Sequence, residues 1–326
     1  MRPTLGIDIA KLTFEVHLLH PDQQLCGSFA NSPPGFEHLQ RRLEQISEQP
    51  IHVCLEATGR YGHALACFLH QRGHRVSLVN PARIKAFGQS LLQRTKTDAT
   101  DARLIARFCQ MHRPAAWTPL APDKHRLQQL TRRRQALLKM RQQERNRLQS
   151  GVSDEFVRQS LLDHIAFLTQ QIEVLETQTQ HLIAHNPSLK QADQLLRSIP
   201  GIGEQSAPII LAEIPEIGAF DHAGQLVAYA GVNPQQHRSG TSVRKQTRIS
   251  KRGNARLRAA LYFPAITAKT RYETFQAFTQ RLEAKGHCKM SIVCAIMRKL
   301  LHLVFGILKS GQPFDPHYRD KLPVAA

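Results

Sequence analysis

The sequence lacks the features that would place it in a membrane or in an oxidising compartment. We find no run of about 18 uncharged apolar residues, and the most apolar late segment, Ser291 to Lys309, carries Arg298 and Lys299 near its centre. Asp8 interrupts any signal-peptide core at the N-terminus. No C-x-x-C pair occurs among the 6 cysteines, and most of them lie among apolar residues, so we interpret them as small buried side chains rather than zinc ligands. These absences predict a cytoplasmic protein with no membrane partner.

Acidic residues are also few. Asp and Glu total 25 against 44 Lys and Arg, which leaves a formal charge of +19 on 326 residues. An excess of this size indicates a polyanionic partner, and with membrane set aside the partner that fits is nucleic acid. Glycine-rich phosphate loops are absent as well, because neither G-x-G-x-x-G nor G-x-x-x-x-G-K-[ST] follows any expected strand. No nucleotide cofactor is therefore expected.

Residues 1–122 are predicted to form a first domain of alternating strands and helices. Three β-prone runs come first, and helix–strand alternation follows them. This order predicts an α/β domain with a mixed, RNase H-like sheet rather than a doubly wound one. Its last helix should begin at Lys96 and run to about Met111. The expected strands are Leu5–Lys11, Phe14–Leu19, Leu25–Ala30, Ile51–Leu55 and Val76–Val79.

Four acids of this domain form the most informative pattern. Asp8 lies inside a strand, where an unpaired buried carboxylate would cost several kcal/mol, and Glu56 directly follows another strand. Asp98 and Asp101 are three residues apart at the start of a helix, so both lie on one helical face, although acids also suit the positive end of a helix dipole. Together the four predict hard oxygen ligands for two Mg²⁺ ions, with Mn²⁺ as a possible substitute. Such a pair of ions neutralises charge in phosphodiester cleavage.

Residues 123–187 are predicted to form a helical arm. Gly151 and the following Ser153-Asp154-Glu155 mark a break and a new helix cap, so we expect two long helices in an antiparallel coiled-coil hairpin. This arm would be a spacer or a dimerisation element. The basic run Arg132-Arg133-Arg134 fits a phosphate contact or, as we favour, a solvated helical face. The seam of the second helix has apolar spacings of four and three residues, at Leu161, Ile165, Leu168, Ile172, Leu175, Thr179 and Leu182.

Residues 188–326 are predicted to form a third, mostly helical domain. The stretch Leu196–Gly203 resembles a helix-hairpin-helix element, in which Gly201 and Gly203 would let backbone amides approach a phosphate oxygen at the start of the next helix. The same P-G-I-G sequence also occurs as an ordinary tight turn. Two apolar helices, 257–270 and 291–309, should form the core of this domain.

A polar segment, Gly231–Arg244, lies between these elements and contains Ser239. It has no apolar stripe of helical period, and we expect an exposed loop. Basic residues are dense in it and after it, which favours a track along a DNA backbone, with a solvated basic loop as the alternative. The predicted nucleic-acid-binding residues here are Arg238, Arg244, Lys245, Arg248, Lys251, Arg252 and Arg256.

Taken in order, three stretches resemble the DEDD motifs of one family of bacterial insertion-sequence transposases. In that family a RuvC-like domain is joined through a coiled coil to a second transposase domain. Ile199–Gly203 and the Arg238-Ser239-Gly240 loop resemble that second domain, so the likeness covers nearly the whole chain. The three stretches are Gly6-Ile7-Asp8, Glu56-Ala57-Thr58-Gly59 and Lys96-Thr97-Asp98-Ala99-Thr100-Asp101-Ala102-Arg103.

The resemblance implies a recombinase guided by a structured noncoding bridge RNA that pairs with target and donor DNA. It implies magnesium dependence, and homodimers that pair into a homotetramer on DNA. It also implies a bacterial protein that acts at the nucleoid. By this likeness Ser239 is the nucleophile that forms a phosphoserine link to DNA, with Ser242 as the fallback. The metals would be held by Asp8, Glu56, Asp98 and Asp101.

The residues themselves support the serine less well than the acids, because no evident His–Asp pair would activate its hydroxyl. Two other functions therefore stay open. One is a metal-dependent RuvC-like junction endonuclease in which water attacks the DNA and Ser239 only contacts it. The other is a non-enzymatic scaffold that binds nucleic acid and whose acids are structural.

Overall fold

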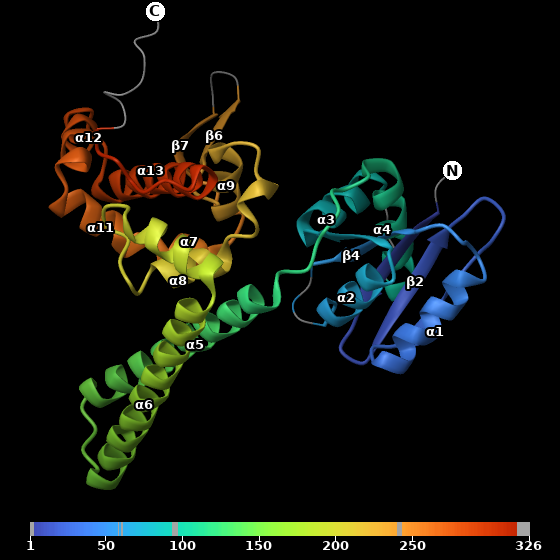
Figure 1. Cartoon of the computed structure of the whole chain (residues 1–326), viewed down its shortest axis with the longest axis horizontal. Coiled ribbons are helices and arrows are strands. Elements are labelled where there is room, and N and C mark those ends of the chain that lie inside the picture. Colours follow the sequence, from blue (N-terminus) through green and yellow to red (C-terminus); the bar gives the residue numbers. More distant parts are fainter. Residues whose placement is uncertain (1–2, 58, 60, 93–96, 240–242, 318–326) are drawn as a thin grey trace, which may run out of the picture. The chain divides into compact units, whose positions relative to one another are not determined.

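The computed structural model describes residues 3–57, 59, 61–92, 97–239 and 243–317, and between residues 236 and 247 it describes the backbone alone. The chain divides into two compact units, Met1–Pro119 and Leu120–Ala326 (Figure 1). Each unit has a hydrophobic core of its own.

A five-stranded mixed sheet with the strand order β3-β2-β1-β4-β5 forms the centre of the first unit. β2 pairs antiparallel with β1 and with β3, whereas β1, β4 and β5 are parallel. This order and these directions are consistent with the predicted RNase H-like fold, and all five predicted strands are present. They are β1 (Thr4–Ile9), β2 (Thr13–Leu19), β3 (Cys26–Ala30), β4 (His52–Glu56) and β5 (Arg75–Val79).

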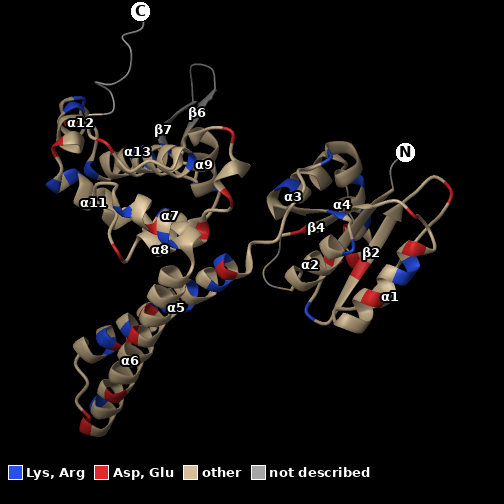
Figure 2. Cartoon of the chain, in the orientation of Figure 1, with Lys and Arg blue, Asp and Glu red and all other residues tan. Residues whose placement is uncertain are grey.

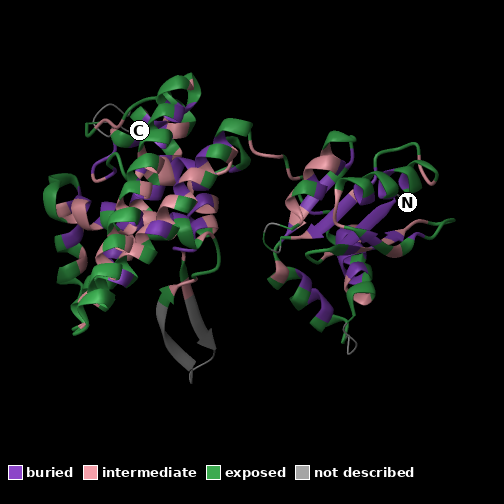
Figure 3. Ribbon diagram, turned by 90° about the horizontal axis from the view of Figure 1, so that it is seen from below, coloured by how far each residue is buried: buried purple, intermediate pink, exposed green. Residues whose placement is uncertain are grey.

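Helices cover both faces of this sheet. Side chains alternate between its two sides, so apolar residues point to both faces and each face has a core with helices. The helices are α1 (Pro33–Glu44), α2 (His63–Gln71), α3 (Pro81–Ser90) and α4 (Asp98–His112). Leu5 and Ile7 of β1 belong to the core with apolar residues of α1 and α2. Cys54 and Val79 belong to a separate core with residues of α3 and α4. Figure 3 shows the strands largely buried and the outer sides of the helices exposed.

Gly6 determines how closely α4 approaches the sheet. A Cβ atom at this position in β1 would lie 2.2 Å from the backbone oxygen of Ala102 and 2.2 Å from the backbone nitrogen of Ala106. Only glycine permits so close a contact between a strand and a helix backbone. The charges of Asp98 and Asp101 act on Asp8, so the first turn of α4 lies at the C-terminal end of β1.

The second unit begins with the predicted arm. α5 (Pro122–Gln149) and α6 (Glu155–His185) pack along each other as an antiparallel pair (Figure 1). The predicted seam is confirmed, because each of its residues on α6 is buried or half-buried. Figure 2 shows charges of both signs along the arm. Arg134 is ion-paired with Glu176 of α6, and Arg132 with Glu213 outside the arm, so the prediction of a solvated face is wrong for these two arginines.

The described remainder of this unit consists of helices of different lengths and a β-hairpin. Its elements are α7 (Pro187–Arg197), α8 (Ala207–Glu213), the 3-10 helix η1 (Ile217–Ala219), α9 (Ala223–Ala230), β6 (Pro234–Ser239), β7 (Val243–Ile249), α10 (Ala255–Ala260), α11 (Tyr262–Arg271), α12 (Glu273–Ala284) and α13 (Lys289–Ser310). α13 packs against α9 and α11 and buries Ile296, Leu300 and Val304, among others. By length and composition this helix could also cross a membrane, but its apolar side forms the core of the unit.

Two elements of this region differ from the sequence prediction. The polar segment Gly231–Arg244, expected to be a loop, contributes to the β6–β7 hairpin. Among the residues that the structure describes, each of these two strands pairs with the other alone, and neither carries the apolar alternation by which a half-buried strand is recognised. The helix predicted over 257–270 is divided between α10 and α11. Pro264 explains the division, because it has no N–H to continue the helical hydrogen bonds.

The cysteines are only partly as predicted. Cys54 and Cys109 are buried, as expected of small hydrophobic side chains. Cys26 and Cys288 are exposed, and for them that interpretation is wrong.

Replacing Gly6 by alanine tests the contact between β1 and α4. The new Cβ would overlap backbone atoms of Ala102 and Ala106, which cannot move without displacing the helix. We expect the free energy of unfolding to fall by about 2–3 kcal/mol, measured in urea. Gly306→Ala is the control, because a Cβ there meets nothing within 4 Å and alanine suits the interior of α13. Equal losses in the two variants would contradict the proposed role of Gly6.

Candidate active site

Asp8 and Glu56 lie at the same end of neighbouring strands. The parallel register of β1 on β4 brings the two acids side by side at the C-terminal ends of their strands. Because side chains alternate along a strand, Asp8 shares the face of Gly6, which α4 covers. Glu56 likewise shares the face of Cys54, which belongs to the core formed with α3 and α4. Both carboxylates therefore belong to the α4 side of the sheet.

Asp98 and Asp101 lie in the first turn of α4, as predicted. Thr97 caps this helix, since its Oγ1 accepts from the Thr100 N–H at 3.2 Å, while the Oγ1 of Thr100 accepts from the Thr97 N–H at 2.9 Å. The cap makes Asp98 the first helical residue. Since α4 lies over β1, its first turn brings these two acids to the end of the strand.

The electrostatics of Asp8 show that the other three acids act on it. Burial, which has the largest effect, and the charges of Asp101, Asp98 and Glu56 together raise the pKa of Asp8 to about 6. A hydrogen bond from the backbone of Ile9 partly offsets these effects. The strand, the neighbouring strand and the helix thus concentrate negative charge at one place.

These acids fit a divalent cation by their chemistry. They offer only carboxylate oxygens, the ligands that Mg²⁺ prefers, and they come from two strands and a helix whose relative positions are set by packing. Within the described ranges, no three Asp, Glu, His or Cys side chains lie close enough together to hold a metal ion. Mutual repulsion opposes such an approach when no cation lies between the carboxylates.

β2 contributes an acid that the sequence analysis did not single out. The register pairs Glu15 with Asp8, so this half-buried carboxylate lies on the same face of the sheet. Its neighbours Phe14, Val16 and Leu18 alternate with it and point into the core on the other face. That alternation is the signal in the sequence that would have identified Glu15.

Ser239 lies in the second unit, as the last residue of β6. The hairpin register pairs it with Val243, and it pairs Arg238 with Arg244, which places two basic residues at facing backbone positions. Ser242, the fallback nucleophile, lies outside the described residues. The hairpin therefore brings Ser239 to the turn between its strands.

The predicted basic track is partly described. Arg248, Lys251, Arg252 and Arg256 are exposed between the end of β7 and the first turn of α10. For Arg244 and Lys245 the described part is the backbone of β7, next to the same stretch. Arg258, by contrast, donates from Nη1 to the backbone oxygen of Ala230 at 2.9 Å.

The turn that contains Gly201 and Gly203 connects α7 to α8. Gly201 has φ +90°, and a Cβ there would lie 2.4 Å from the backbone oxygen of Pro264, so close packing against α11 accounts for this glycine. Gly203 is exposed, and its N–H donates to Ser206 Oγ at 3.1 Å. The helix that follows, α8, begins at Ala207. Phosphate binding at this turn remains a prediction.

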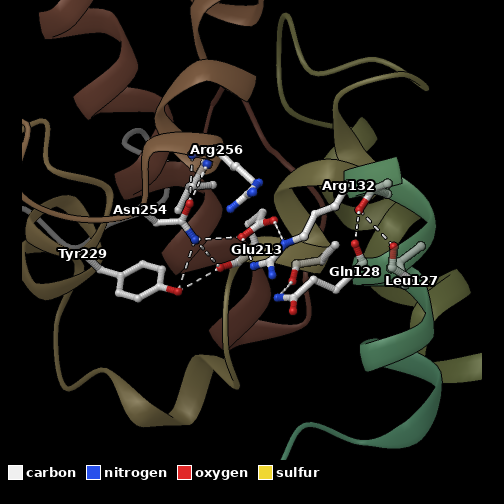
Figure 4. Close-up of polar contacts among 10 residues, drawn as sticks. Leu127, Gln128, Arg132, Glu213, Tyr229, Asn254 and Arg256 are labelled. Atoms are coloured by element: carbon white, nitrogen blue, oxygen red, sulfur yellow. Dashed lines mark hydrogen bonds and ion pairs between the residues drawn. The ribbon is translucent and has the colours of Figure 1, made fainter. Parts of the chain in front are cut away.

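A buried polar network in the second unit was also missed (Figure 4). Glu213, at the end of α8, is bound by Arg132, Asn254 and Tyr229. Burial alone would raise the pKa of Glu213, but hydrogen bonds from Arg132 and Asn254 and the charges of Arg132 and Arg256 outweigh burial and lower it. No local motif marks this network, because its members are far apart in the sequence.

Two family models match the chain. The DEDD model of the IS110 group, described as a transposase, matches residues 5–157, and it covers all four acids. The model described as the transposase IS116/IS110/IS902 family matches residues 193–280, and it covers Ser239.

Full-length relatives give the same result. The chain is 37% identical over 320 residues to a pilin gene-inverting protein of Moraxella bovis, an alignment that covers 97% of this chain and 98% of the relative. It is 25% identical to the transposase for insertion sequence element IS1328 of Yersinia enterocolitica, over 95% of this chain and 98% of that protein. It is also 25% identical to the transposase for insertion sequence element IS1111A of Coxiella burnetii, over 79% of this chain and 75% of that protein.

Asp8→Asn should stabilise the fold above neutral pH. The folded pKa of Asp8 lies near 6, above the ordinary value of 3.8, so stability from this group is greatest at low pH and is lost as the pH rises through about 6. Allowing for the partial exposure of Asp8, the cost at pH 8 is about 1 kcal/mol. We expect the melting temperature of the variant to exceed that of the wild type by about 2 °C at pH 8 without divalent cations, and by a smaller amount at pH 5.

Magnesium provides the second half of this test. Mg²⁺ should raise the melting temperature of the wild type, and Asp8→Asn should reduce that response. Asp22→Asn, which removes an exposed acid of the same unit, is the control and should change neither quantity. A wild type that is insensitive to pH and to Mg²⁺ alike would contradict the charge concentration at Asp8.

Proposed function

The chain belongs to the IS110 family of DEDD transposases, and from this premise we propose that it is an RNA-guided DNA recombinase. Membership makes the chain a transposase or invertase enzyme, which removes the non-enzymatic scaffold from the alternatives. The observation that carries the proposal is the gathering of four acids at one end of the sheet, in a chain that aligns almost end to end with a gene-inverting protein.

The proposed reaction is a pair of transesterifications. The hydroxyl oxygen of Ser239 attacks a DNA phosphodiester, a phosphoserine bond forms, and the bond from phosphorus to a sugar oxygen breaks. The sugar hydroxyl of another strand then attacks the phosphoserine and releases the serine, so the number of phosphodiester bonds is conserved. The proton lost by each attacking hydroxyl is balanced by the proton taken up by the leaving oxygen.

Asp8, Glu56, Asp98 and Asp101 are the residues that would hold two Mg²⁺ ions, or Mn²⁺ in their place. When bound, such ions neutralise charge at the attacking and leaving oxygens. The raised pKa of Asp8 supports this assignment, because carboxylates that repel one another gain most from a cation between them. We further propose that the RuvC-like residues 1–122 carry the metals and that residues 188–326 carry the serine.

Nucleic acid would be bound in two ways. The exposed Arg248, Lys251, Arg252 and Arg256 suit phosphate contacts, which contribute affinity with little sequence preference. A structured noncoding bridge RNA would supply the sequence recognition by pairing with target and donor DNA, as in other RNA-guided systems. The arm, residues 123–187, would join subunits into homodimers that pair as a tetramer on DNA. Two sites in one DNA molecule would then yield inversion, as the name of the Moraxella relative describes.

Trapping of the covalent intermediate tests the nucleophile. Labelled DNA is incubated with the protein, its RNA and Mg²⁺, then denatured in detergent, and label that migrates with the protein is measured. We expect an adduct in the wild type and in Ser242→Ala, and a loss of about 100-fold or more in Ser239→Ala, because no other group replaces a lost nucleophile. Strand cleavage without any labelled protein would instead identify the water-dependent endonuclease.

Mixing two inactive variants tests whether one active site draws on two chains. Asp8→Ala lacks an acid and Ser239→Ala lacks the nucleophile, so each alone should be inactive. Mixed assemblies can contain one site with all its groups if acids and serine come from different subunits. Random mixing of subunits should leave about a quarter of the sites complete, so we expect the yield of covalent adduct to return to about a quarter of the wild-type yield. Activity that stays at the level of the separate variants would show that each chain uses its own serine.

A further inference from the structure

The hairpin that carries Ser239 is connected to the rest of its unit by two short joints. The first joint, residues 231–233, follows α9, and the second, residues 250–254, precedes α10. The joints are bound to each other: the Ser250 N–H donates to the backbone oxygen of Asn233 at 3.0 Å, and Ser250 Oγ donates to Asn233 Oδ1 at 2.6 Å. The Lys251 N–H donates to the backbone oxygen of Gly231 at 3.0 Å. These three hydrogen bonds therefore hold the two joints together at the base of the hairpin.

Asn254 ties this base to the start of α10 and to the end of α9. Its Oδ1 accepts from the N–H groups of Arg256 and Leu257, both at 3.0 Å, which caps α10. Its own N–H donates to the backbone oxygen of Tyr229 at 2.6 Å. Gly253 allows this approach, because a Cβ there would lie 2.3 Å from that same oxygen.

Residues at or near both joints form hydrogen bonds with Glu213. Asn254 Nδ2 donates to Glu213 Oε2 at 2.8 Å, and Tyr229 Oη donates to the backbone oxygen of Glu213 at 3.2 Å. The side chain of Glu213 is 1% exposed, so these contacts are shielded from water. Glu213 therefore contacts Tyr229, two residues before the first joint, and Asn254, the last residue of the second.

The same carboxylate is held from the arm. Arg132 of α5 donates from Nε to Glu213 Oε1 at 2.7 Å and from Nη2 to Oε2 at 2.9 Å, a two-point contact that defines the orientation of both groups (Figure 4). Gln128, one turn earlier on α5, donates from Nε2 to the backbone oxygen of Ala212 at 3.1 Å. The buried carboxylate thus lies between the base of the arm and the base of the hairpin.

We propose that Glu213 is a positioning residue that, through Arg132 and Asn254, holds the serine hairpin in one orientation relative to the arm. This inference rests on the proposed function only in taking Ser239 as the reacting group. If the arm joins subunits, the arrangement of the subunits determines the orientation of the hairpin that carries Ser239. Glu213 would exert this effect at a distance from the DNA chemistry. Glu213 itself stays ionised in its ion pair, so it orients the hairpin and exchanges no proton.

A distance measurement on the full chain tests this proposal without relying on catalysis. Spin labels on an encoded ketone-bearing amino acid at Gln143 of α5 and Arg248 of β7, both exposed, report the orientation of the hairpin relative to the arm. We expect one narrow distance distribution in the wild type and a width about twofold greater in Glu213→Gln, which removes the charge and keeps the shape. Each variant is measured at a temperature at which circular dichroism shows it folded.

The matched control is Glu176→Gln. Glu176 also pairs with an arginine of α5, Arg134. This arginine also donates to Gln205 in the turn before α8, but neither contact involves a residue of the hairpin joints. This variant should keep the narrow distribution. If Glu213→Gln fails to fold, Asn254→Ser replaces it, because serine still caps α10 but lacks the Nδ2 group that donates to Glu213. A distribution as narrow as that of the wild type in the folded Glu213 or Asn254 variant would overturn the proposal.

The covalent adduct supplies a second readout. We expect the adduct yield of Glu213→Gln to fall by about tenfold or more while DNA binding is unchanged, because a misplaced nucleophile loses rate rather than affinity. An unchanged yield would overturn the proposal. If no adduct forms even in the wild type, the proposed serine chemistry fails, while the distance distributions still decide whether Glu213 orients the hairpin.

Discussion

The concentration of negative charge at one end of a buried sheet is the constraint on which the first unit depends. Asp8 is half-buried in a strand beside Glu56, and α4 adds Asp98 and Asp101, so the pKa of Asp8 rises to about 6. As a purely structural arrangement this is unfavourable, because an apolar residue in the strand would avoid both desolvation and repulsion. Cations between the acids reverse the sign of the interaction. Gly6 and the cap at Thr97 serve the same arrangement, since one sets the distance of α4 from the sheet and the other sets where that helix begins.

The second unit solves a different physical problem, which is to orient a polar hairpin that has no apolar face of its own. Two strands alone are only marginally stable in water, so their orientation has to come from the chain around them. Hydrogen bonds between the two joints, a tightly packed Gly253 and the buried Glu213–Arg132 pair provide it. Arginine has two roles in this region. Arg132 forms an internal ion pair. Arg248 and Arg256 are instead exposed at the base of the hairpin, where a polyanion could reach them.

The alignments with relatives extend over both units. A protein named for gene inversion and proteins named for transposition align with this chain over most of its length, which includes the sheet, the arm and the hairpin. Inversion and transposition both break and rejoin phosphodiester bonds, and they differ in where the two DNA sites lie. If the proposed function is correct, one set of acids and one serine would serve both outcomes. The arrangement of the sites, rather than the chemistry of the protein, would then decide which outcome follows.

Elements whose signals are local can be predicted from the order of residues. The five strands, the paired helices of the arm and the acids in the first turn of α4 follow from apolar periodicity, helix caps and breakers, which act within a few residues. The tertiary structure alone decided the features that depend on contacts between distant segments. Glu15 acquires its place beside Asp8 from strand register, Gly201 is explained by the backbone of Pro264, and Glu213 meets Arg132 and Asn254 from three separate helices or their caps. The β6–β7 hairpin belongs to the same class, because backbone pairing holds it together and leaves almost no trace in the order of side chains. Local patterns record how a segment folds, whereas the partners of a buried charge or a close backbone contact are chosen only when the segments pack together.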